Sequence, residues 1–103
     1  MFGLFIFSAA RKLDSGAVRR HFGVKKVRFA DRDELMELTG LVPGSVPPFG
    51  KPLINLDLYV DNSIVKNDQI AFNAGSLTDS IIMSVEDYLK VANAEIFEFS
   101  KEG

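Results

Sequence analysis

All four prolines of this 103-residue chain lie within ten positions, from Pro43 to Pro52. Proline fixes the backbone angle φ, lacks an N–H donor and restricts the residue before it, so this stretch continues neither a helix nor a sheet. Gly44 and Gly50 let the backbone turn or approach a ligand closely. We therefore expect a rigid, irregular loop from Gly44 to Gly50, which is either a binding element or a plain connection between a helix and a strand.

The composition is that of one globular domain, and we expect residues 1–103 to form a single domain. The chain has no cysteine, which excludes disulfide scaffolds, thiolate metal sites and cysteine nucleophiles. Because His21 is the only histidine, the sequence favours neither a zinc site nor a histidine-based triad, and we expect no metal and no cofactor. The apolar run from Met1 to Ala10 is about half a membrane span and its charges follow it, so we expect no signal peptide, no membrane partner and a cytoplasmic location.

Charge is distributed unevenly along the chain. Residues 1–32 contain eight Lys or Arg and two Asp, whereas the remainder contains four Lys or Arg and twelve Asp or Glu. The first third therefore either presents a basic face to a nucleic-acid backbone or carries ordinary solvated side chains. The candidate nucleic-acid contacts are Arg19, Arg20, Lys26, Arg28 and Lys51.

Local signals predict alternating strands and helices. Asp14 or Ser15 begins a helix that ends at Phe22 before Gly23, a capping-box pattern begins another at Asp31, and Ser84 caps a third through Ala92. Apolar runs and alternation predict strands over residues 2–8, 24–30, 53–60, 69–74, 80–83 and 95–99, the first of them central and buried on both faces. We expect a mixed α/β or α+β domain with a largely antiparallel curved sheet and about three helices.

Five segments, in order and spacing, resemble the YbaK and prolyl-tRNA editing domain family of aminoacyl-tRNA deacylases. They are Lys-Val-Arg-Phe-Ala30, Leu-Thr-Gly40, Gly44-Ser-Val-Pro-Pro-Phe-Gly50, Tyr-Val-Asp61 and Phe-Asn-Ala-Gly75. The similarity runs from about Phe5 to Val91, and its most specific part is the Gly-x-x-x-Pro pattern of residues 44–48 followed by Phe-Gly. This resemblance implies hydrolysis of the ester that joins a wrong amino acid to the 3′ end of an aminoacylated tRNA.

The resemblance also implies a site made of two glycine-containing loops whose backbone N–H groups hold the ester carbonyl. It implies catalytic roles for Gly44, Pro48, Ala74 and Gly75. It implies substrate-binding roles for Thr39, Ser45, Val46, Phe49, Gly50, Asp61, Asn73 and Ser76. Two of these residues keep an alternative: Asp61 either binds an amino group or caps a turn, and Thr39 either lines the pocket or caps its helix.

The chain departs from the family pattern at two points. Members of the family have several tens of residues, including a lysine that engages the tRNA end, before the strand matched by residues 2–8; here Lys51 is the nearest substitute. Asn73 stands where YbaK-like members tend to have serine, which leaves the amino-acid preference open. We expect an unpaired sheet edge covered by self-association into a homo-oligomer. The alternative function is a non-catalytic module that binds an aminoacyl group, a tRNA end or a protein.

Overall fold

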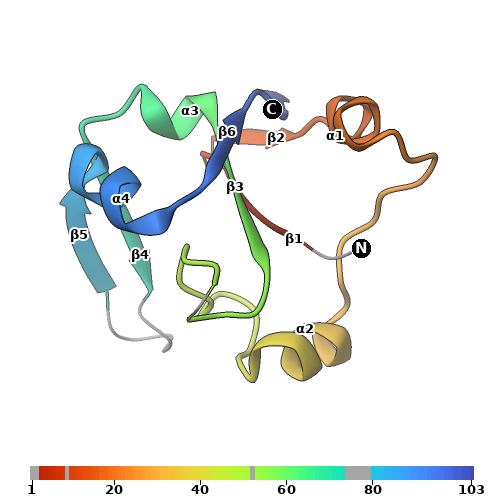
Figure 1. The fold of residues 1–103 in the computed structure, drawn as a ribbon, viewed down its shortest axis with the longest axis horizontal. Coiled ribbons are helices and arrows are strands. Elements are labelled where there is room, and N and C mark those ends of the chain that lie inside the picture. The colour runs from red at the N-terminus through yellow and green to blue at the C-terminus, as the bar shows by residue number, and fades with distance from the viewer. Residues whose placement is uncertain (1–2, 9, 52, 74–79) are drawn as a thin grey trace.

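The strand β3 (Asp57–Asp61) lies at the centre of the fold in the computed structural model, which describes residues 3–8, 10–51, 53–73 and 80–103 (Figure 1). Two strands pair with it in parallel, β1 (Gly3–Ile6) on one side and β6 (Glu95–Phe97) on the other. Four of the five β3 residues are buried. The central position therefore belongs to β3, and the prediction that residues 2–8 form the central strand is wrong, since β1 is at an edge and only partly buried.

Two smaller sheets flank this core and are both antiparallel. β2 (Arg11–Leu13) pairs with β7 (Ser100–Glu102), and β4 (Gln69–Asn73) pairs with β5 (Ser80–Ser84). The mixed α+β class is confirmed. The arrangement differs from expectation in detail, because the strands of the described residues divide among three sheets, of which the central one is parallel.

The three predicted helices are confirmed, and their ends follow the capping residues. The helix α1 (Ser15–Phe22) starts at Asp14, whose side chain accepts a hydrogen bond from the Ala17 N–H, and ends at Gly23. The helix α2 (Arg32–Thr39) starts with the capping box between Asp31 and Glu34. The helix α4 (Val85–Ala92) starts at Ser84. A fourth, one-turn helix, α3 (Asn62–Val65), was not predicted.

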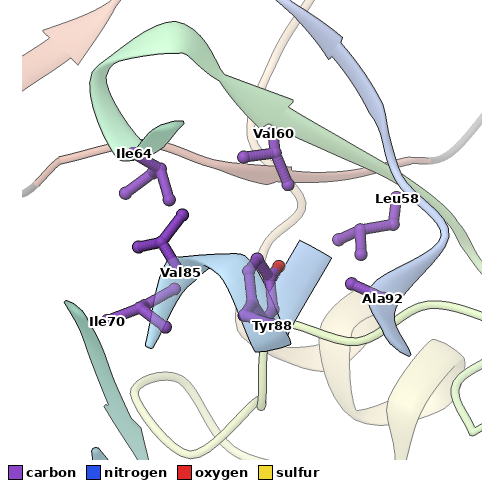
Figure 2. Close-up of a cluster of buried hydrophobic side chains, with 7 residues drawn as sticks. All are labelled: Leu58, Val60, Ile64, Ile70, Val85, Tyr88 and Ala92. Carbon is purple, nitrogen blue, oxygen red and sulfur yellow. The ribbon is translucent and has the colours of Figure 1, made fainter. Parts of the chain in front are cut away.

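One face of β3 packs on the helix α4 (Figure 2). Leu58 and Val60 point from β3 towards Tyr88 and Ala92 of α4, and Ile64 of α3 lies beside them. Val60 and Tyr88 are completely buried. This cluster fixes α4 against β3, and Tyr88 thereby reaches the proline-containing loop described below.

The opposite face of β3 carries an aromatic cluster. The Tyr59 ring stacks on Phe5 with 4.9 Å between centroids, and the Phe22 ring of α1 meets Tyr59 edge-on at 5.0 Å. Phe99 is completely buried in the same cluster. Alternation along β3 thus sends Leu58 and Val60 to one layer and Tyr59 to the other, so both faces of the central strand are covered.

Three strand predictions need correction. Residues 24–30 form no strand: they run irregularly from α1 to α2, and Phe29 is 73% exposed because no neighbouring strand pairs with them. The predicted strand 53–60 begins only at Asp57, and the predicted strand 95–99 ends at Phe97. Whether a segment forms a strand depends on hydrogen bonding to a partner that is distant in sequence. The alternation of apolar and polar residues within seven positions carries no information on that partner. Across the described ranges, no helix is long and apolar enough to cross a membrane.

Candidate functional site

The proline-containing loop, residues 41–51, is irregular, as the sequence predicts. Gly44 has φ of 86°, a left-handed conformation that favours glycine. The Ser45 side chain is buried, and its hydroxyl and its N–H both donate to the Val42 carbonyl, at 2.8 and 3.1 Å. The first half of the loop is therefore a tight turn closed by its own hydrogen bonds.

The second half of this loop is anchored on the core. The Tyr88 hydroxyl donates a 2.6 Å hydrogen bond to the buried Pro48 carbonyl. Burial raises the pKa of the Tyr88 hydroxyl, which keeps it protonated as a donor. At Gly50 the backbone passes so close to β3 that an added Cβ would lie 2.6 Å from the Leu56 carbonyl oxygen. Gly50 is thus required by close packing.

The end of strand β4 meets the loop from the other side. The Asn73 Nδ2 donates to the Gly44 carbonyl at 2.6 Å, and the Ser80 hydroxyl donates to Asn73 Oδ1 at 3.2 Å. Beside this contact the rings of Phe49 and Phe72 meet edge-on, 5.4 Å between centroids. The structure therefore brings together Gly44, Phe49 and Asn73. The predicted site residues Ala74, Gly75 and Ser76 lie outside the described residues.

An apolar cavity of about 370 Å³ lies beside the ring contact between Phe49 and Phe72. Its lining residues are Thr39, Leu41, Pro47, Phe49, Leu53, Ile54, Phe72 and Ile81. Thr39 and Phe49 were predicted site residues. The other lining residues were not predicted, because leucine, isoleucine and phenylalanine side chains indicate core in general, and a proline such as Pro47 indicates a turn, so neither carries a signal for a cavity.

Thr39 fits both of its predicted alternatives. Its hydroxyl donates to the Leu35 carbonyl at 2.8 Å and accepts from the Leu41 N–H at 3.1 Å, so it closes the end of α2. Its side chain also lines the cavity. Since both hydrogen-bonding roles of the hydroxyl are used, Thr39 adds little polarity to the cavity wall.

Asp61 lies at the other end of β3 from the loop. Its side chain is buried and accepts hydrogen bonds from the N–H groups of Ser63, Phe99 and Ser100 and from the Ser100 hydroxyl, at 2.6 to 3.0 Å. Burial alone raises the pKa of Asp61, but these hydrogen bonds outweigh it and bring the pKa down to about 2. Of the two predicted roles, this geometry is that of a cap, here for α3.

A second, more polar cavity of about 290 Å³ opens beside Asp61. Its lining residues are Ser8, Ala10, Arg11, Asp61, Asn62, Ser63, Lys66, Asn67 and Glu98. The Arg11 guanidinium there already donates to the hydroxyl and the carbonyl of Ser100, at 2.7 and 3.1 Å. This cavity therefore lies where Arg11 and Asp61 bind Ser100 of strand β7, away from the proline-containing loop.

Two of the predicted nucleic-acid contacts are engaged in ion pairs. Arg28 forms a two-pronged pair with Glu34 at 2.6 and 2.8 Å, which lowers the Glu34 pKa to about 2. Lys51 lies 3.3 Å from Asp57. Arg19 and Arg20 are exposed on α1, and Lys26 is exposed on the connection that follows.

His21 packs at the end of α1. Its ring stacks on Phe97 with 3.8 Å between centroids, and its Nε2 lies 2.5 Å from a Glu95 carboxylate oxygen. Within the described part of the chain, no cluster of three or more His, Asp or Glu side chains is placed to hold a metal ion.

Chemically, the loop and the strand end offer hydrogen-bonding groups without charge. Residues 44–50 contain no ionisable side chain. The polar groups there are backbone N–H and C=O groups, the Ser45 hydroxyl, which already donates to the Val42 carbonyl, and the Asn73 amide, which already bonds Gly44 and Ser80. Such an arrangement orients and polarises a carbonyl, and it suits a substrate that is already activated.

Comparison with known proteins places this geometry in context. The family model of the aminoacyl-tRNA editing domain matches residues 2–91. A multifunctional Ser/Thr-tRNA deacylase, ProXp-y, of Escherichia coli strain K12 is 37% identical over 100 residues, which are 95% of this chain and 59% of that protein. The ProXp-y of Escherichia coli O157:H7 matches equally. The chain thus spans about three fifths of the length of these curated relatives.

Solved structures agree with this match. A candidate trans-editing enzyme for prolyl tRNA synthetase superposes with a TM-score of 0.82 and 29% identity, over 98% of this chain and 62% of that chain. The hypothetical protein APE2540 superposes with a TM-score of 0.81 and 23% identity, over 94% of this chain and 63% of that chain. The second likeness shows the shared fold alone.

Proposed function

Because the chain belongs to the aminoacyl-tRNA editing domain family, we propose that it is a deacylase that acts in trans on mischarged tRNA. Its substrate is the ester between a wrongly attached amino acid and the tRNA 3′ end, and its place of action is the cytoplasm. The observation that carries the proposal is the hydrogen bond from Asn73 to Gly44, which joins the proline-containing loop to the end of β4. The name of the Escherichia coli relative makes seryl and threonyl esters the first to test.

The proposed reaction needs little from side chains. An aminoacyl ester is already activated, so the protein must orient its carbonyl, position a water molecule and stabilise the negative oxygen that forms. We assign the ester end to Gly44 through Pro48, and we propose that Ala74 and Gly75, which follow β4 in the sequence, complete the site. The water oxygen bonds to the carbonyl carbon, the bond from that carbon to the ribose oxygen breaks, and a water proton passes to the departing ribose oxygen, which becomes a hydroxyl.

The remaining proposed contacts surround this point. We propose further substrate contacts from Ser45, Val46 and Gly50 of the loop, from Thr39 and Phe49, which line the apolar cavity, and from Asn73 and Ser76. We leave Asp61 out of the proposed site because its oxygens already accept four hydrogen bonds at the far end of β3. For the tRNA backbone we propose the basic residues Arg19, Arg20, Lys26, Arg28 and Lys51.

A deacylation assay tests the proposal, with tRNAs charged with serine, threonine or alanine. We expect hydrolysis above the spontaneous rate, and we expect the substitution Gly44→Ala to abolish it. Gly40→Ala is the matched control, because Gly40 also has positive φ, 73°, but ends helix α2 with nothing within 4 Å of an added Cβ. It should keep most of the activity.

Two results would contradict the proposed function. Hydrolysis no faster than the spontaneous rate would exclude the deacylase, and the alternative of a non-catalytic binding module would remain. A gel-shift assay with charged and uncharged tRNA then tests that alternative. Full activity in Gly44→Ala would show that the proline-containing loop is not part of the site.

We also propose that copies of the chain associate. Large apolar side chains are exposed on different elements, with Leu53 at 69%, Ile82 at 67% and Val91 at 65% exposure. Sedimentation velocity over a concentration series tests this, and a monomer at every concentration would refute it.

A further inference from the structure

The Asn73 side chain joins two elements that are 29 residues apart in sequence. Its amide nitrogen donates to the Gly44 carbonyl in the loop, and its amide oxygen accepts from Ser80, its partner residue across the β4–β5 pair. A backbone carbonyl only accepts hydrogen bonds, whereas a serine hydroxyl both donates and accepts. The nitrogen must therefore face Gly44, and the Ser80 hydroxyl then donates to the amide oxygen and limits the rotation of the side chain.

This contact acts on one peptide unit of the loop. Asn73 holds the carbonyl of the Gly44–Ser45 peptide, and the N–H at the other end of the same peptide donates to the Val42 carbonyl at 3.1 Å. The peptide plane is thus fixed from both sides. Because Gly44 sits at φ of 86° with no Cβ to restrict it, external contacts have to select this orientation.

We propose that Asn73 is a positioning residue of the deacylase: it orients the Gly44–Ser45 peptide and, through it, the backbone groups of the loop that receive the ester. This inference rests on the proposed function and changes the role of Asn73 within it, from substrate contact to support of the loop. Only a carboxamide donates to the loop and accepts from Ser80 at once with this reach.

The test compares Asn73→Asp with the wild type in steady-state deacylation. An ionised aspartate has nearly the same shape but cannot donate, and it repels the Gly44 carbonyl. We expect kcat to fall about tenfold or more, by comparison with the loss of a direct transition-state donor, while KM stays within about twofold. Ser80→Ala, which only frees the amide to rotate, should lower kcat by less. Asn55→Asp adds the same charge at an exposed position before β3 and serves as the control.

A second measurement does not depend on activity. Amide hydrogen exchange of Ser45, followed by NMR, should be roughly tenfold faster in Asn73→Asp than in the wild type, while the Val60 amide of β3 exchanges at the same rate in both. Unchanged Ser45 exchange would refute the positioning role. So would a raised KM with unchanged kcat, which is the signature of a substrate contact. If the wild type shows no deacylation, the proposed function fails and the exchange comparison alone decides the role of Asn73.

Discussion

Replacing Asp61 with asparagine should destabilise the protein strongly, although the two side chains have almost the same shape. The Asp61 carboxylate accepts four hydrogen bonds while buried, from Ser63, Phe99 and Ser100. An asparagine keeps one oxygen for the N–H groups of Phe99 and Ser100 and turns an NH₂ group towards the Ser63 N–H. The α3 cap is then lost and two donors face each other.

The size of the effect follows from these contacts. Hydrogen bonds to a charged group are worth about 1.5–3 kcal/mol each, and a lost helix cap costs about 1 kcal/mol. Because the variant keeps part of the network, we expect the free energy of unfolding to fall by about 2–3 kcal/mol at pH 7. For a domain of this size, that loss lowers Tm by roughly 10 °C or more.

The pH dependence separates this explanation from simple misfolding. The folded-state pKa of Asp61, about 2, lies below the value near 3.9 of an unfolded aspartate. Ionised Asp61 therefore contributes about 2–3 kcal/mol to the free energy of unfolding, which is present above about pH 5 and is lost as the pH falls towards 2. The asparagine side chain of the variant does not titrate, so the stability difference between wild type and Asp61→Asn should narrow over that window.

Urea unfolding followed by circular dichroism between pH 2.5 and 7 measures both quantities. Asp57→Asn, at an exposed position of the same strand, is the matched control and should change stability by less than about 0.5 kcal/mol. Equal stability of wild type and Asp61→Asn at pH 7, or a constant difference between them down to pH 2.5, would refute the reasoning.

Two further variants test how the loop is anchored. Gly50→Ala places a methyl group 2.6 Å from the Leu56 carbonyl oxygen, so we expect a loss of about 1–3 kcal/mol in thermal unfolding and reduced deacylation; a wild-type Tm would show that the backbone yields freely. Tyr88→Phe leaves the buried Pro48 carbonyl without its donor, so we expect a loss of about 1–3 kcal/mol in urea unfolding; wild-type stability would mean that this hydrogen bond contributes nothing net.

The helices were predictable because their signals are local. Asp14, Asp31 and Ser84 each cap a helix through a side chain that bonds a backbone N–H three residues later. Each of these contacts lies within four consecutive residues, so the sequence alone indicates it. Helix α3 has the same kind of signal at Asp61, but its single turn leaves no apolar periodicity that distinguishes it from the end of a strand.

The strands and the site could be predicted only in part, because they depend on contacts between residues that are far apart in the sequence. The alternation of residues 24–30 predicts a strand, yet no described strand pairs with it, whereas the three-residue strand β2 exists because a distant partner does. The irregular loop was predicted from its prolines and glycines. Its contact with Asn73 and the adjoining apolar cavity depend on how β4 packs against it, which no local pattern contains.

The β2–β7 pair joins Arg11 to Glu102 and so brings together two segments that are far apart in sequence. During synthesis, Arg11 leaves the ribosome long before its partner does. Strand β2 must therefore wait for β7, whereas β1 pairs with the earlier strand β3, and the hydrogen bonds between Asp61 and Ser100 form only after residue 100 has emerged. Strand β2 therefore depends on a partner strand that is synthesised much later.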